Sequence, residues 1–134
     1  MEVKIETKER FRVISVVAEH FTATLAEELS QKLTPYLPPD VKSSETPGNI
    51  VLKMTAVSTI DLAGAQSLLN LQQQFYEHHQ SFVICELQPA VIANLEKEEL
   101  LELMNVTPTE SEAWDIVQME EIERELLDNE FSDD

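Results

Sequence analysis

The chain has 134 residues, of which 43% are hydrophobic, and a formal net charge of -17. This length suits one compact domain with a single core, and the charge disfavours nucleic acid and anionic membrane surfaces as partners. No apolar run approaches the roughly 20 residues that cross a bilayer, and the amino terminus lacks the apolar segment of a secretion signal. We therefore expect a cytoplasmic protein without direct membrane insertion.

The negative charge is concentrated towards the carboxyl terminus. Residues 96–134 contain fifteen acidic and two basic residues, a net of -13, whereas residues 1–95 contain eleven acidic and seven basic residues, a net of -4. A basic protein partner suits such a surface better than a phosphate backbone does. Cys85 is the one cysteine of the chain, which excludes an internal disulfide and a cysteine-based zinc site.

The amino-terminal third predicts two strands and a helix. Residues 2–6 and 11–19 are rich in β-branched side chains, which favours strands. Leucine recurs every fourth residue within 25–33, which predicts a helix, and Thr24 and Glu27 fit a capping box at its start. The prolines that follow cannot continue this helix.

The middle of the chain alternates strands and helices. Residues 38–48 have the composition of an exposed loop, and residues 49–55 ("NIVLKMT") predict the next strand. A helical pattern covers residues 66–78, and residues 82–87 ("FVICEL") predict a fourth strand.

The carboxyl-terminal part predicts two more helices around a short strand. Pro89 suits the first turn of a helix, residues 105–107 predict the strand, and a capping-box pattern opens an acidic helix over residues 109–127. We assign residues 1–127 to a single domain, and we expect residues 128–134 to be a disordered acidic tail.

This order of elements defines the fold class. Two strand-helix-strand passages imply right-handed crossovers between parallel strands. We therefore predict an α/β fold with a mixed β-sheet of about four to five strands and helices packed on it, in the order β-β-α-β-α-β-α-(β)-α. The oligomeric state stays open.

A strand-to-helix corner, "STIDLAGAQS" at residues 58–67, combines an acid with one of only two glycines. Asp61 can accept from the free amides of the helix and complement its positive end. Gly64 lets backbones pass where a Cβ would collide. The corner is either a tight structural turn or a binding surface, because open α/β sheets tend to place binding sites at such helix starts.

Candidate catalytic and metal-binding residues are sparse. His78 and His79 are adjacent, so on a helix they point about 100° apart and cannot share a metal, and His20 is distant in sequence. The paired glutamates fall on helix faces that we expect to be solvated, and the chain has no glycine-rich phosphate loop. We expect no enzymatic activity, no catalytic residue, no metal site and no cofactor.

The motifs, in their order and spacing, resemble the STAS domain, the fold of bacterial anti-sigma-factor antagonists. The stretch "NIVLKMTAVSTIDLAGAQSLL" is similar to the central strand of the family and its "DSSG" corner, and Ala18 to Phe21 match the family's "GELD" turn. The later stretches "VICELQPAVIANLEKEEL" and "TESEAW" also match family motifs. The resemblance covers about residues 3–118.

The resemblance implies a phosphorylation switch that this chain departs from. In the family, a partner kinase that is also the anti-sigma factor phosphorylates the serine before the glycine. Here Ala63 stands at that position and Leu62 at the preceding serine, while Phe21 replaces the turn aspartate and Glu99 replaces a later glycine. The nearby hydroxyls, whose phosphorylation the sequence leaves open, belong to Ser58, Thr59 and Ser67.

We therefore expect a regulatory protein-binding module of signal transduction or transcription regulation, without the standard phospho-switch. The expected partner is an anti-sigma factor or another histidine-kinase-type ATPase. The alternative is a STAS-type accessory subunit that binds the ATPase of an ABC lipid transporter. The expected binding residues are Asp61, Leu62, Ala63, Gly64, Gln66, Ser67, His20, Phe21 and Thr22.

Two surface features complete these expectations. Leu62, Ala63 and Phe21 should form an apolar patch that a partner can cover. The acidic helix over residues 109–127 should pack on the sheet with its acids in solvent; alternatively, it docks a basic partner or masks the binding surface.

Overall fold

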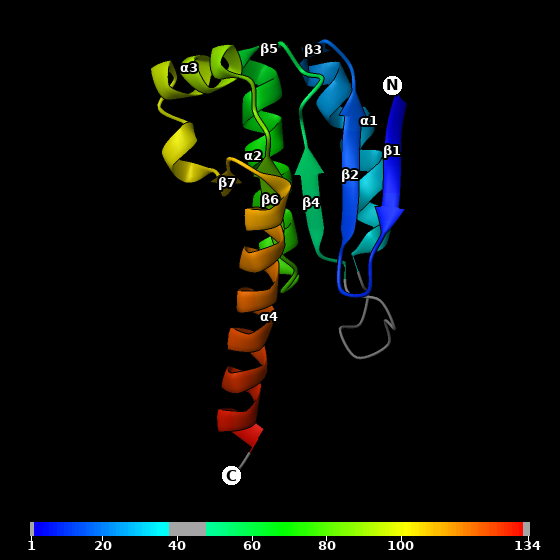
Figure 1. The fold of residues 1–134 in the computed structure, drawn as a ribbon, viewed down its shortest axis with the longest axis vertical. Coiled ribbons are helices and arrows are strands. Elements are labelled where there is room, and N and C mark those ends of the chain that lie inside the picture. The colour runs from blue at the N-terminus through cyan, green and yellow to red at the C-terminus, as the bar shows by residue number, and fades with distance from the viewer. Residues whose placement is uncertain (1, 38–47, 133–134) are drawn as a thin grey trace.

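A computed structural model describes residues 2–37 and 48–132 (Figure 1). The strands of its main sheet are β1 (Glu2–Thr7), β2 (Arg12–Val17), β4 (Ile50–Lys53), β6 (Phe82–Cys85) and β7 (Val106–Thr107). They lie in the order β1-β2-β4-β6-β7, with β1 antiparallel to β2 and all other neighbours parallel. The predicted α/β class and mixed sheet are therefore confirmed.

The described residues also form four α-helices and two short 3-10 helices. They are α1 (Ala23–Leu33), η1 (Thr34–Tyr36), α2 (Leu62–Glu77), α3 (Pro89–Lys97), η2 (Leu101–Leu103) and α4 (Glu110–Ser132). α2 begins four residues before its predicted start, and α4 continues through Ser132 instead of ending at residue 127. Except for Gly48, the predicted loop over 38–48 lies outside the described residues, as do residues 133–134. No helix in the described ranges is long and apolar enough to cross a membrane.

Helices cover both faces of the main sheet. α1 and α2 pack on one face, where Phe75 and several leucines join Ile14 and Leu52 in the larger core. α4 packs on the other face against β4, β6 and β7, in a smaller core that includes Val51 and Val117. Successive residues of a strand point to opposite faces. Val51 and Leu52 therefore face different helices, and both are fully buried. Burial on both faces explains why β4 reads as a continuous apolar run.

A second sheet of two short strands lies beside the starts of α1 and α2 (Figure 1). It consists of β3 (His20–Phe21) and β5 (Thr59–Ile60), which pair in parallel. The sequence did not predict these strands, because two residues are too few to show an alternating pattern. Their pairing joins the turn before α1 to the corner before α2.

Side-chain caps mark the starts of the helices. Thr22 is the N-cap of α1, and its hydroxyl accepts a hydrogen bond from the Leu25 amide at 3.3 Å. Thr24 is already helical, so the capping box predicted to begin there is wrong. The prediction for α4 is confirmed at its cap, since the Glu112 amide donates to the Thr109 hydroxyl at 3.2 Å.

α3 ends in a backbone conformation that usually requires glycine. Glu99 has a φ of 60°, in the left-handed region. Its amide donates to the Glu96 carbonyl at 3.0 Å, and the Leu100 amide donates to the Leu95 carbonyl at 2.9 Å. These two bonds form a Schellman motif. Glu99 therefore keeps the geometry of the glycine that the family resemblance places at this position.

Candidate functional site

The pairing of β3 with β5 brings the turn and the corner into one surface. The Thr59 amide donates to the Glu19 carbonyl at 3.1 Å, and the Asp61 amide donates to the Phe21 carbonyl at 3.2 Å. Beside them, Nδ1 of His20 lies 2.6 Å from the Thr59 hydroxyl oxygen, although the two residues are 39 positions apart in the sequence. Side chains from both segments can therefore meet the same partner.

Asp61 caps α2, as the sequence predicted. Its Oδ1 accepts a hydrogen bond from the Gly64 amide at 2.6 Å, and its carbonyl accepts the first helical bond from Ala65 at 2.9 Å. The carboxylate also places negative charge at the positive end of the helix. This cap fixes the direction in which the first turn of α2 leaves the corner.

Gly64 allows the first turn of α2 to touch the backbone before α1. A Cβ at Gly64 would lie 2.7 Å from the carbonyl oxygen of Phe21 and 3.1 Å from the carbonyl carbon of Thr22. The predicted close approach is therefore present, and its partner is the β3–α1 junction. Asp61 and Gly64 together hold the corner against the turn.

Most of the predicted binding residues reach the surface, but Phe21 and Gly64 do not. Leu62 is 44% exposed. The other exposed members of the set are His20, Asp61, Ala63 and Gln66; Thr22 and Ser67 are half-buried, and Gly64 is buried. Phe21 is fully buried in the larger core, so its predicted place in an apolar surface patch is wrong. Alternation along β3 points His20 outward and Phe21 inward.

A shallow groove between α1 and α2 adjoins the corner, and the sequence analysis did not identify it. Its lining residues are Ala23, Ala26, Glu27, Ser30, Ser67, Asn70, Leu71 and Gln74. Ser67 lies one turn after Ala63 and connects the corner to this groove. The small residues at positions 23, 26 and 30 repeat at helical spacing, which is the signal that could have indicated an open groove.

The chemistry available at this surface is hydrogen bonding and apolar contact. The Thr59 hydroxyl and the His20 imidazole are both exposed to solvent. Among the side chains that the structure describes, in residues 2–37 and 48–127, no group of three or more His, Cys, Asp or Glu residues is placed to hold a metal ion.

The acidic helix does not cover the corner. α4 runs along the sheet, and its carboxyl end lies at the opposite end of the molecule from β3 and β5 (Figure 1). The alternative that this helix masks the binding surface is therefore wrong for the residues that the structure describes.

One family model matches most of the chain. The family model of the STAS domain matches residues 2–113. No curated protein sequence matches the chain.

Solved structures show the same fold at low sequence identity. An anti-sigma-factor antagonist (STAS) domain protein from Planctomyces limnophilus has a TM-score of 0.65 at 16% identity, with 83% of this chain and 93% of that chain covered. The unphosphorylated anti-sigma factor antagonist SpoIIAA has a TM-score of 0.59 at 14% identity, with 87% and 98% covered. The murine anion transporter Slc26a9 has a TM-score of 0.67 at 17% identity; 85% of this chain matches, but it spans only 18% of the transporter.

Proposed function

Because the chain belongs to the STAS domain family, we propose that it is a non-catalytic regulatory module that binds a protein partner at the start of α2. The observation that carries this proposal is the exposed pair Leu62 and Ala63 at the start of α2. The cap by Asp61 and the close contact of Gly64 fix this pair beside β3. An apolar centre surrounded by a polar rim is the usual arrangement of a protein interface. The rim consists of His20, Thr59, Asp61 and Gln66.

The proposed module lacks the serine switch of its family. Phosphorylation adds nearly two negative charges and bulk to a helix start that binds a partner. Ala63 has no hydroxyl to accept a phosphoryl group, so the position that carries the family's switch stays unmodified. Binding should then depend on the amount of protein and partner rather than on a kinase.

We propose an anti-sigma factor or another histidine-kinase-type ATPase as the partner. The similarity to SpoIIAA over nearly the whole length of both chains supports this class. The ATPase of a lipid transporter is the alternative partner.

Affinity recovery of the tagged full chain from its native cells, followed by mass spectrometry, tests both the surface and the partner class. Leu62→Asp places a charge in the centre of the proposed contact, whereas Leu103→Asp makes the same change at another exposed leucine, on η2. We expect a histidine-kinase-type ATPase with the wild type and with Leu103→Asp, and its loss with Leu62→Asp. Retention with Leu62→Asp would contradict the proposed surface, and recovery of a transporter ATPase would support the alternative.

The recovered kinase provides a second test of the missing switch. Ala63→Ser should become phosphorylated on incubation with the kinase and ATP, while the wild type should not. Stoichiometric phosphate on Ser58, Thr59 or Ser67 of the wild type, found by phosphopeptide mass spectrometry, would show that the switch has moved rather than disappeared.

A further inference from the structure

α4 has two different surroundings along its length. Its first half lies on the sheet, where Ala113 and Val117 are fully buried and Phe11 packs against Trp114 at 5.2 Å between ring centroids. Its carboxyl-terminal part extends past the sheet and past the other helices (Figure 1). The helix therefore presents a long surface that the domain itself does not cover.

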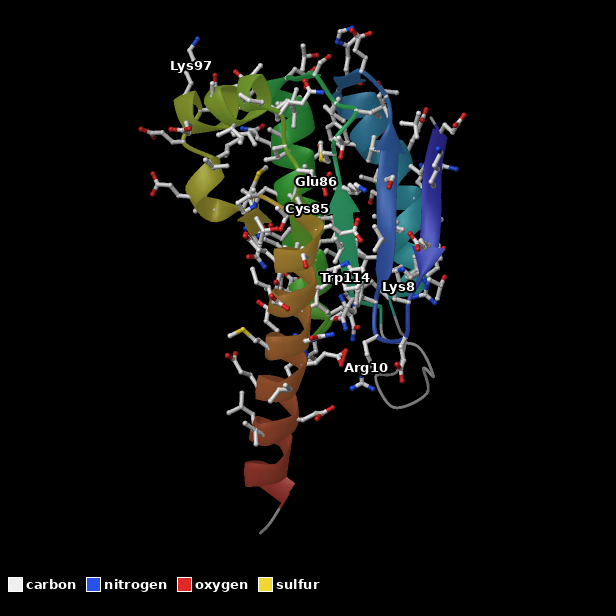
Figure 2. All side chains as sticks on the ribbon, in the orientation of Figure 1. Lys8, Arg10, Cys85, Glu86, Lys97 and Trp114 are labelled. Atoms are coloured by element: carbon white, nitrogen blue, oxygen red, sulfur yellow. The ribbon has the colours of Figure 1, made fainter. Side chains whose placement is uncertain are left out.

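Polar contacts near the β1–β2 turn fix which side of α4 faces the domain. Glu121 accepts hydrogen bonds from Arg10 at 2.8 Å and from Asn49 at 2.6 Å, and Glu125 accepts one from Arg10 at 3.2 Å. Figure 2 shows Arg10, Lys8 and Trp114 where this turn meets the helix. Because these contacts hold the inner side, the helix cannot rotate to bury its outer side.

The outer side of α4 carries an apolar stripe. Met119, Ile122 and Leu126 are 59%, 57% and 61% exposed, respectively. They are three and four residues apart, so they lie on one helix face. At about 100° per residue, this face is opposite the one that buries Ala113 and Val117. We call Met119, Ile122 and Leu126 the outer stripe.

Acidic residues surround the outer stripe. Glu123 lies between Ile122 and Leu126, and Glu112 and Asp115 continue the same face towards the start of the helix; all three are exposed. Residues 110–127 contain seven acidic residues and one base, Arg124, a net charge of -6. Arg124 points towards the domain, where it donates to Asn49 at 3.2 Å. It therefore does not neutralise the outer face.

This charge pattern disfavours a second copy of the chain as the occupant. The spacing of the outer stripe is that of core positions in a coiled coil. In a pair of identical helices, Glu112 and Asp115 would continue the core positions, and Glu123 would flank them on both chains. Like charges at these positions repel each other, and charged core positions must lose their water.

We propose that the outer stripe of α4 is a second docking surface, separate from the corner at α2, for a partner helix with apolar residues at spacings of three and four and flanking lysine or arginine. Such a helix would cover the three apolar side chains and pair its cations with the acids beside them. The charges would speed encounter and set specificity, while the buried apolar area would supply much of the affinity.

Isothermal titration calorimetry with a designed peptide tests this surface on the full chain. The probe is a helical peptide of about three heptads with leucine at a and d and lysine at e and g, and the control peptide has glutamate at e and g. Ile122→Glu disrupts the outer stripe, and Leu103→Glu makes an equal charge change at an exposed leucine outside α4. Both side chains are exposed, so both variants should fold.

We expect the lysine peptide to bind the wild type and the glutamate peptide not to bind. Ile122→Glu should weaken binding of the lysine peptide roughly tenfold or more, whereas Leu103→Glu should leave it nearly unchanged. Equal affinities of the two variants for the lysine peptide would overturn the proposal, because binding would then depend only on the net charge of the chain and not on the outer stripe. Sedimentation equilibrium showing a wild-type dimer that Ile122→Glu dissolves would also overturn it in favour of a second copy.

Discussion

Gly64 and Phe21 meet so closely that the carbonyl oxygen of Phe21 occupies space where a Cβ of residue 64 would lie. The distance from an ideal Cβ to that oxygen is 2.7 Å, and the contacting atom belongs to the backbone, which cannot swing aside as a side chain can. The contact joins the first turn of α2 to β3. It therefore determines the shape of the proposed corner surface.

Gly64→Ala should lower the free energy of unfolding by about 1–3 kcal/mol, because the added methyl group overpacks this contact. The loss should appear although alanine favours a helix over glycine by about 1 kcal/mol. Urea unfolding followed by the fluorescence of Trp114, the one tryptophan of the chain, measures the change. Ala63→Ser at the exposed neighbouring position is the control, and a stabilised Gly64→Ala protein would contradict the close contact.

Asp61→Ala should destabilise the protein by about 1 kcal/mol, because it removes the cap from the Gly64 amide and negative charge from the start of α2. Asp61→Asn keeps an acceptor oxygen, so its loss should be smaller. Glu77→Ala removes an exposed acid from the negative end of the same helix, so it should be neutral or slightly stabilising. Chemical denaturation ranks the three variants, and equal losses for Asp61→Ala and Glu77→Ala would mean that the cap contributes nothing.

Glu99→Gly should stabilise the protein by about 1 kcal/mol, because glycine adopts the left-handed conformation without the Cβ penalty. His79→Gly should behave similarly, since His79 also has a φ of 60° and follows the end of α2. Glu98 has a φ of -86°, so Glu98→Gly should destabilise the protein instead. Thermal unfolding midpoints of the three variants test this difference between Glu98 and Glu99. A lower midpoint for Glu99→Gly than for the wild type would contradict the prediction.

Asn49→Ala should cost about 2–3 kcal/mol, because it leaves buried polar groups without partners. Asn49 is fully buried, accepts from the Ser81 amide at 2.7 Å and donates to Glu121 at 2.6 Å. It thereby links the residue before β6 to α4. Asn70→Ala, at an exposed asparagine on α2, is the matched control in denaturant titrations. Similar losses of unfolding free energy at both positions would mean that the hydrogen bonds of Asn49 do not contribute to stability.

Cys85 should resist alkylation in the folded protein. Burial, with the nearby carboxylates of Glu86 and Glu110, raises the pKa of its thiol from 9.0 to about 12, and the thiolate is the reactive form. Iodoacetamide at about pH 8 should therefore label the thiol only after denaturant is added, which mass spectrometry detects. Rapid labelling of the folded chain would contradict this burial.

The same shift predicts a loss of stability at alkaline pH. Because the folded pKa is the higher one, the contribution of Cys85 is fully present below about pH 9 and is lost as pH rises towards about 12. Tyr76 adds to this loss, since burial and its hydrogen bond with Glu120 raise the pKa of its phenol. Tyr76→Phe should therefore lose less stability than the wild type between about pH 9 and pH 11, measured by denaturation at each pH.

The sequence indicated much of the fold and the cap that positions the proposed corner surface at the start of α2. Runs of β-branched residues marked the main strands, and the position of Asp61 three residues before Gly64 marked the cap of α2. Two predictions about the turn before α1 were wrong, because the conformation of that turn depends on its pairing with the corner before α2. The cap of α1 is Thr22 rather than Thr24, and Phe21 is buried, because β3 exists only through its pairing with β5.

The sequence by itself determined the α/β class, the acidic carboxyl-terminal helix and the absence of a hydroxyl at Ala63, because these follow from composition and from interactions within a few residues. The tertiary structure decided which side chains share a surface. Thr59 meets His20 across 39 positions, and Glu121 meets Asn49 across 72. Contacts of such separation depend on how the strands pair and on which face a helix packs. The packing of the folded chain therefore determined that Phe21 is internal and that the outer stripe of α4 faces away from the domain.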